Sequence, residues 1–251
     1  MNLARRPASL WLADALVVAA IAAWAFGARS LPEFVLPGPL AVAERMWVLF
    51  TDLEFLSHTV ASTVRVLASV LIALLLGGGL ALLARSVPLL DGVISGLLAP
   101  FLNAFPSIGW AILAAIWFQP GHLSIVFVQV AILTPFCLIN VAEGLRQVDR
   151  EMIEMARSFT RRRGRVLASV TLPLLLPYLA GALRIAYGVA WKIALVAELL
   201  GSTSGLGFLM LRAQGSADLT TVLAACLAIV ALFWAGERLL LDPVARRFAA
   251  R

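Results

Sequence analysis

The sequence contains few of the side chains on which enzymes and metal sites depend. Only 14% of its 251 residues are charged, and it has two histidines and two cysteines. His58 and His122 both lie near predicted membrane boundaries, and no metal site or nucleophile-and-base pair can be assembled from them. Cys137 and Cys226 lie inside apolar runs, which is typical of packed thiols and gives no sign of a disulfide framework. We therefore expect no enzymatic activity in this chain.

Lysine is scarcer still, because Lys192 is the single lysine of the chain. Its surroundings, GVAWKI, lack the glycine spacing of a phosphate-binding loop, so ATP hydrolysis by that route is excluded. The net charge of +6 and the pI near 10.6 come mainly from arginines beside apolar segments, without interleaved aromatic side chains. Membrane topology explains these arginines better than nucleic-acid binding does.

Apolar residues dominate what is present. They make up 62% of the chain, with a mean hydropathy of +0.96, whereas soluble domains have roughly 45–50% apolar residues. A spanning helix needs about 20 apolar residues. The composition therefore predicts an all-α integral membrane protein with several spans, short loops and one membrane domain.

Six stretches are apolar and long enough to predict transmembrane helices: 10–28, 59–84, 93–118, 123–142, one beginning near 173, and 219–240. A secretory signal peptide competes for the first stretch, but the run is long and further spans follow it. Residues 29–55 read as an extramembrane connector. The glycines at 77–79 predict close packing of the second span against a neighbour, and Pro100 and Pro106 interrupt the third.

The longest polar interruption lies between residues 151 and 177. Within it, Met152, Met155, Ala156 and Phe159 recur at helical spacing, which predicts a short amphipathic helix with one apolar side. An ordinary surface helix would show the same pattern. The residues that follow give it a more specific interpretation.

Glu154 and Ala156 precede Val170, Leu172 and Pro173 at a fixed distance. This spacing resembles the EAA loop of ABC importer permeases, in which Glu-Ala-Ala is followed by a glycine and then by Ile-x-Leu-Pro. Thr160 stands where the family has the glycine that ends the first helix, and Gly164 is expected to supply the turn instead. Residues 100–118 and 197–208 resemble the nitrate, sulfonate and taurine-type members of this family.

Basic residues near the span ends predict the orientation. Fourteen arginines fall on one side, namely those at 5, 6, 85, 146, 150, 157, 161, 162, 163, 165, 238, 246, 247 and 251, whereas Arg29, Arg45 and Arg212 fall on the other. The EAA-like loop and both termini are therefore predicted to be cytoplasmic.

The resemblance implies a type I importer permease with six transmembrane helices and a cytoplasmic coupling helix. It implies three regions: 1–58, an N-terminal helix and external connector; 59–241, the permease domain; and 242–251, a cytoplasmic tail. It also implies a multi-pass protein of the bacterial inner membrane that carries a small, anionic solute such as nitrate, a sulfonate or taurine.

The partners implied by the family are a second permease chain, identical or similar, two ATPase subunits, an external or periplasmic solute-binding protein and membrane lipid. ATP and magnesium are expected on the ATPase, with no cofactor or metal in this chain and no nucleic-acid partner. Contact with the ATPase is assigned to the loop, at Met152, Glu154, Met155, Ala156, Phe159, Thr160 and Gly164.

Two further sets of site residues follow from the same interpretation. The polar, glycine-rich loop after the fifth span is expected to contact the binding protein through Ser202, Gly205 and Gly207, although a plain flexible turn fits as well. The fifth span contains Arg184, Gly188, Trp191 and Lys192 on one broad face, which either lines the pathway for an anion or forms structural ion pairs, with Glu143 or Asp91 as partners.

Two other functions remain open at this point. An ion-coupled secondary transporter needs carboxylates at the membrane midplane, whereas the available ones lie toward span ends: Asp14, Asp91, Glu143 and Glu198. A membrane scaffold without transport activity would leave the register of the EAA-like loop unexplained. The sequence does not identify the solute.

Overall fold

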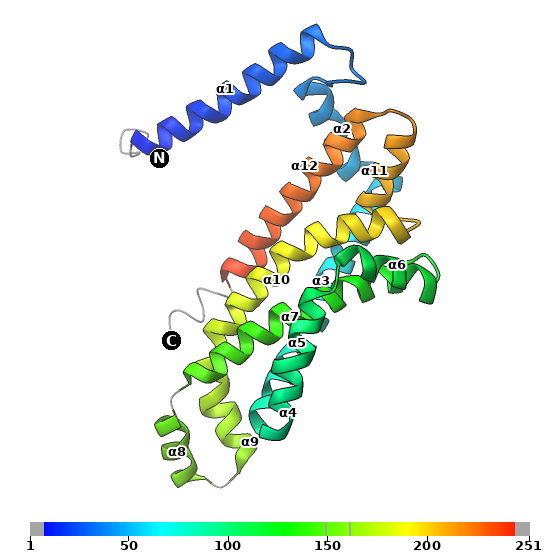
Figure 1. The fold of residues 1–251 in the computed structure, drawn as a ribbon. Helices are drawn as coiled ribbons and strands as arrows, with labels where there is room; N and C mark the ends of the chain where they lie inside the picture. The colour runs from blue at the N-terminus through cyan, green and yellow to red at the C-terminus, as the bar shows by residue number, and fades with distance from the viewer. Residues whose placement is uncertain (1–7, 149, 161, 244–251) are drawn as a thin grey trace.

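The structure is a computed structural model that describes residues 8–148, 150–160 and 162–243, and these residues form helices joined by short connections, with no strand among them (Figure 1). The predicted all-α fold is confirmed. The described part contains five helices long and apolar enough to span a membrane, and a bent pair that makes a sixth if it counts as one span. Some of the counted arginines, such as Arg5 and Arg247, and most of the tail lie outside the described residues.

The N-terminal third consists of three helices, α1 (Ala8–Ser30), α2 (Pro39–Thr51) and α3 (Leu53–Ser86). In Figure 1, α1 diverges from the bundle, and its indole Trp24 Nε1 donates to the carbonyl of Pro37 at 3.0 Å. The predicted connector is largely helical. Val42 and Leu49 of α2 are buried in a cluster with α11 and α12. Asp52 caps α3 by accepting from the backbone N–H of Glu54 at 3.0 Å.

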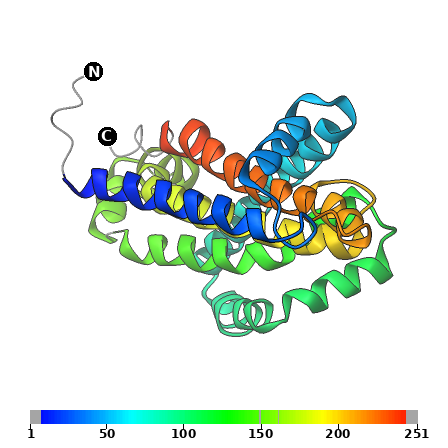
Figure 2. The ribbon, with the colours of Figure 1, turned by 90° about the horizontal axis from the view of Figure 1, so that it is seen from above.

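The third span is broken. It comprises α4 (Pro88–Val93), a π-helical turn (Ile94–Leu98), α5 (Ala99–Ala104) and α6 (Ser107–Trp117). The two arms meet at 86°, and Figure 2 shows the first arm nearly end-on while α6 runs across the view. The break falls at Phe105 and Pro106, as the predicted interruption requires, because proline has no N–H to donate to the preceding turn.

The centre of the bundle is α7 (His122–Gln147), which packs along α3 and α10 (Leu172–Gly201). A Cβ at Gly77 would lie 2.7 Å from Cys137 Cβ, so this glycine permits the close approach of α3 and α7 that the sequence predicts. The fifth span starts earlier than predicted. Helix α9 (Arg163–Val166) and the π-turn Leu167–Thr171 lead straight into α10, and the π-turn brings the chain to Pro173 without a break.

The bundle has two ends that we name by their short helices. The α8 end carries α8 (Arg150–Phe159) and lies at the bottom of Figure 1, whereas the α11 end carries α11 (Leu206–Gly215) and lies at the top. Helix α12 (Leu219–Gly236), extended by the π-turn Glu237–Leu241, runs back from the α11 end. Both ends contain predicted site residues.

Candidate functional site

At the α8 end, the predicted apolar side of α8 is divided between two environments. Met152, Met155 and Phe159 are exposed by 42%, 58% and 85%, whereas Ala156 is only 9% exposed. Half-buried Ile153 accompanies Ala156 toward the chain, because α8 rests on α9 and the following π-turn. The expectation that Ala156 belongs to the docking stripe is wrong, since a small residue is needed where α8 meets its own chain.

The end of α8 also differs from expectation. Gly164 does not form the turn, because it lies inside α9 and only Gly205 has a positive φ among the described glycines. Helix α8 ends at Phe159, and the Thr160 hydroxyl accepts from the backbone N–H of Arg162 at 3.4 Å. A threonine can close a turn in this way without a left-handed residue. Thr160 therefore replaces the family glycine by side-chain hydrogen bonding.

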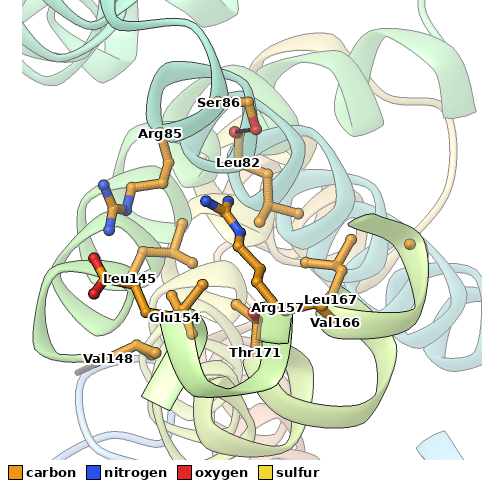
Figure 3. Close-up of a pocket in the computed structure, with 12 residues that line it drawn as sticks. Leu82, Arg85, Ser86, Leu145, Val148, Glu154, Arg157, Val166, Leu167 and Thr171 are labelled. Atoms are coloured by element: carbon orange, nitrogen blue, oxygen red, sulfur yellow. Dashed lines mark hydrogen bonds between the residues drawn. The ribbon is translucent and has the colours of Figure 1, made fainter. Parts of the chain in front are cut away.

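A cavity of about 550 Å³ lies behind α8. Figure 3 shows Arg157 of α8 and Arg85 of α3 reaching into the same space, with Glu154 beside them. Apolar side chains from α3, α7 and the turn before α10 form the rest of its wall. Helix α8 thus rests on α9 and the π-turn, the ends of α3 and α7 border the cavity behind it, and its large apolar side chains remain exposed.

The cations of the fifth span have different surroundings. Arg184 Nε lies 3.0 Å from Glu237 Oε1, and its terminal nitrogen also donates to Asp242. Arg184 therefore forms the structural ion pair that was the alternative to lining the pathway, with partners on and after the last π-turn in place of Glu143 and Asp91. Glu143 instead contacts Arg146 and Gln147 on its own helix.

The remaining residues of that predicted face do not share one side of α10. Trp191 is 3% exposed within the core, Gly188 is half-buried near Phe233, and Lys192 is exposed. Consecutive residues on a helix point about 100° apart, so Trp191 and Lys192 cannot face the same space. Among the described residues, Lys192 has no ion-pair partner, which leaves it as the one member of the set suited to face a pathway or another chain.

At the α11 end, the structure places a buried ion pair that the sequence did not identify. Arg65 of α3 and Glu198 of α10 are each 1% exposed, and Arg65 Nη1 lies 2.7 Å from Glu198 Oε1. The Ser62 hydroxyl donates to Glu198 at 2.8 Å, and Arg65 Nε donates to His122 Nδ1 at 3.1 Å. Buried charges in a span need such partners, and here both charges have them.

The same pair holds the loop between α10 and α11. Arg65 donates to the carbonyl and hydroxyl oxygens of Ser204 at 2.7 and 2.6 Å. The backbone N–H of Gly207 donates to Glu198 Oε2 at 3.0 Å, and that of Leu206 donates to the Ser62 hydroxyl at 2.8 Å. The loop is therefore bonded to two spans and is not a plain flexible turn.

These contacts revise the predicted binding-protein contacts. Gly205 and Gly207 are buried and Ser202 is half-buried, whereas Thr203 is exposed. Gly205 has φ +113°, and a Cβ there would overlap the Glu198 carboxylate. The two glycines are thus required by the approach of Glu198, and the exposed surface of this end is formed by Thr203 and by α11 residues such as Arg212 and Gln214.

A smaller polar contact joins α2 to α12 at this end. Asp218 caps α12 by accepting from the backbone N–H of Thr221 at 3.0 Å, and Arg45 lies 3.8 Å from it. Burial alone would raise the pKa of Asp218, but the hydrogen bonds from Thr221 and the charge of Arg45 outweigh burial and lower that pKa.

Neither end offers an obvious metal site. Within residues 8–148, 150–160 and 162–243, no group of three or more His, Cys, Asp or Glu side chains is placed to hold a metal ion. Glu198, one of the carboxylates considered for ion coupling, is already paired with Arg65. What this geometry offers is an exposed apolar helix at one end and a rigid loop at the other, joined by spanning helices.

Comparison with known proteins agrees with this arrangement. Residues 69–240 match the family described as "Binding-protein-dependent transport system inner membrane component". The taurine transport system permease protein of Escherichia coli is 30% identical over 78% of this chain and 73% of its own length. The riboflavin transport system permease protein of Chloroflexus aurantiacus is 33% identical over 80% and 74%, and the bicarbonate transport system permease protein of Synechococcus elongatus 29% over 78% and 75%.

The family match covers the second half of α3 and every later span, including α8 and the α10–α11 loop, whereas Ser62 and Arg65 lie before it. It explains why an apolar amphipathic helix at one end and a fixed loop at the other occur in one helical membrane protein. This chain belongs to the permease family of binding-protein-dependent ABC transporters.

Proposed function

We propose that this permease is a subunit of an ATP-driven importer and that α8 is the surface on which its ATPase docks. The observation that carries the proposal is the exposed apolar side of α8, formed by Met152, Met155 and Phe159. Exposed apolar side chains on a helix between charged neighbours mark an interaction surface when they lie together. ATP and magnesium are bound by the partner, and this chain supplies only the contact.

The orientation of the permease in the membrane is inferred from its charges. Arginines gather at the α8 end, so we infer that this end is cytoplasmic and that both termini lie on the same side of the inner membrane. The α11 end then faces the solute-binding protein. A cysteine at exposed Ser216, in a background without Cys137 and Cys226, should react with an impermeant thiol reagent from outside intact cells. Labelling only after permeabilisation would reverse this topology.

The pathway is proposed to lie between two permease chains, either two copies of this chain or this chain and a similar one. Lys192 is exposed on α10 and bears a charge that has no partner among the described residues. A cation in a span is costly in lipid and is usually directed toward a protein interior or an aqueous cavity. We infer that Lys192 faces this pathway, and that Arg184 is a structural residue because it is already paired.

The solute is proposed to be a small anion. The bicarbonate system is named for a small anion and the taurine system for a solute that bears a sulfonate group, whereas the name of the riboflavin system indicates that similar permeases serve other chemistry as well. Lys192→Met should lower uptake of an anion at least about tenfold without lowering the amount of assembled complex, and Lys192→Arg should retain uptake. Equal uptake by the Met and Arg variants would reject this role.

The docking role is tested by adding charge to the exposed side of α8. Phe159→Asp should leave the permease in the membrane but prevent co-purification of the ATPase, because a desolvated charge at an interface costs several kcal/mol, about 2–5. Ser158→Asp is the matched control, since it adds the same charge one position away on another side of the helix. Normal ATPase recovery with Phe159→Asp would remove α8 from the interface.

A further inference from the structure

We propose that Arg65 and Glu198 are positioning residues that hold the α10–α11 loop in the shape the solute-binding protein engages, and that they link this shape to α8. The inference rests on the proposed function, because it assumes that the α11 end meets the binding protein. It adds two residues that do not themselves touch the partner, since both are 1% exposed.

While the pair is intact, several hydrogen bonds restrict the conformation of the loop. Arg65 bonds to Ser204 twice, Glu198 accepts from Gly207, and the Ser62 hydroxyl joins Glu198 to Leu206. The backbone N–H of Gly205 donates to His58 Nδ1 at 3.0 Å as well. Three consecutive backbone N–H groups are therefore bonded to side chains of α3 and α10.

The loop in turn orients the exposed part of α11. Phe208 follows the loop directly and stacks on His58, with ring centroids 5.8 Å apart. Arg212 also lies over the Phe208 ring, with its guanidinium carbon 5.9 Å from the ring centroid. Exposed Thr203, Arg212 and Gln214 thus owe their places to a loop whose shape depends on the buried pair.

At the other end of the bundle, the two paired helices border one cavity. Residues Gly164–Gly201 form one continuous helical span of 38 residues, which is about 57 Å long. Its first residues, and Leu82, Arg85 and Ser86 at the end of α3, line the cavity behind α8. The ion pair therefore joins, at the α11 end, two helices that border the cavity behind α8, and the helix of Glu198 continues from the α9 and π-turn segment on which α8 rests.

A displacement of the loop would accordingly change how α3 and α10 lie against each other and how they hold α8. Coupling between distant sites needs a physical element that both sites bias. The paired helices are that element here. Loss of the pair should free the loop and uncouple binding-protein docking from ATP hydrolysis, while leaving the ATPase bound.

The test uses the full complex in lipid nanodiscs with its ATPase and its solute-binding protein. Hydrogen exchange of the Gly205–Gly207 amides reports the loop directly. Glu198→Gln and the milder Ser62→Ala should speed this exchange at least about tenfold, because each removes partners of buried donors. The same variants should lower binding-protein-stimulated ATP hydrolysis at least about tenfold with unchanged basal hydrolysis.

Tyr187→Phe is the control, since it removes a buried hydroxyl that donates to the Leu232 carbonyl at 3.1 Å, away from the loop. If exchange stays slow in Ser62→Ala and Glu198→Gln, the pair does not hold the loop and the inference is overturned. If exchange accelerates but stimulation persists, the loop shape is not what the binding protein engages. An unmodified complex that shows no stimulation at all would contradict the proposed function instead.

Discussion

The two ends of the bundle differ in whether their side chains have partners within the chain. At the α11 end, two buried charges are joined by hydrogen bonds to a loop, and the exposed surface is held in one shape. At the α8 end, three large apolar side chains are exposed and two arginines reach into a cavity of about 550 Å³. The buried charges of one end have partners within the chain, whereas the other end leaves large apolar side chains exposed, as the proposed ATPase contact requires.

The difference predicts how the ends respond to substitution. Changes inside the α11 network should alter the stability of the permease itself. Changes on the exposed side of α8 should alter assembly and leave the stability of the isolated permease unchanged. Four predictions follow this division, beginning with the largest effect.

Arg65→Leu should lower the free energy of unfolding by about 3–5 kcal/mol, because it leaves the Glu198 charge buried without its main partner. Arg65→Leu combined with Glu198→Leu should recover part of that loss, since it removes the unpaired carboxylate, whereas the Gly207 N–H and the Ser204 carbonyl still lose their partners. Denaturant unfolding of the purified permease measures both. A double variant no more stable than Arg65→Leu would show that the pair is not what stabilises this end.

Phe159→Ser should weaken ATPase binding by about 2 kcal/mol, roughly 30-fold, because large apolar side chains near the centre of an interface contribute most of its affinity. Phe159 is 85% exposed, so the melting temperature of the permease alone should not change. Titration of the ATPase onto nanodisc-bound permease gives the affinity. A fall in permease stability would mean that Phe159 packs within its own chain.

Ala156→Asp should destabilise the permease by about 1–3 kcal/mol, since it places a charge where α8 rests on its own chain. Met155→Asp changes the neighbouring residue, which lies about 100° around the helix and is 58% exposed, and should have almost no effect on stability. Thermal unfolding of the two variants separates the inward and outward sides of α8. Equal melting temperatures would place Ala156 on the exposed side after all.

Asp218→Asn should cost about 1 kcal/mol, because it weakens the cap of α12 and the contact with Arg45. The pKa of Asp218 is lowered in the folded protein, so its carboxylate stabilises the fold above the unfolded pKa of about 3.9. That contribution is lost as the pH falls through the folded pKa. The stability difference between the variant and the unmodified protein should therefore shrink in acid, and a constant difference would contradict the assignment.

The features that sequence reasoning predicted are those determined locally. The apolar periodicity of α8, the break at Pro106 and the close approach at Gly77 each depend on neighbouring residues or on the absence of a side chain. The rotation of α8 was not predictable, because the choice of Ala156 rather than Met152 as the inward residue depends on what α8 rests against.

The Arg65–Glu198 ion pair was even less predictable from the sequence than the rotation of α8. Arg65 and Glu198 lie 133 positions apart, so no periodic pattern connects them. A signal was present, since each is an isolated charge inside an apolar span, near the end predicted to lie outside. Opposite charges at matching depth in different spans are candidates for pairing, and the glycines that follow Glu198 are the residues that such a pair would require.

We propose that ATP is used at the α8 end and that the binding protein is engaged at the α11 end. The most direct test is a sided assay on proteoliposomes that contain the permease with its ATPase and that have a known orientation. ATP hydrolysis should rise when ATP and magnesium are on the α8 side and the binding protein is on the α11 side, and not when the binding protein is moved to the α8 side. Stimulation by a binding protein on the α8 side, or solute uptake driven by a proton or sodium gradient without ATP, would contradict the account.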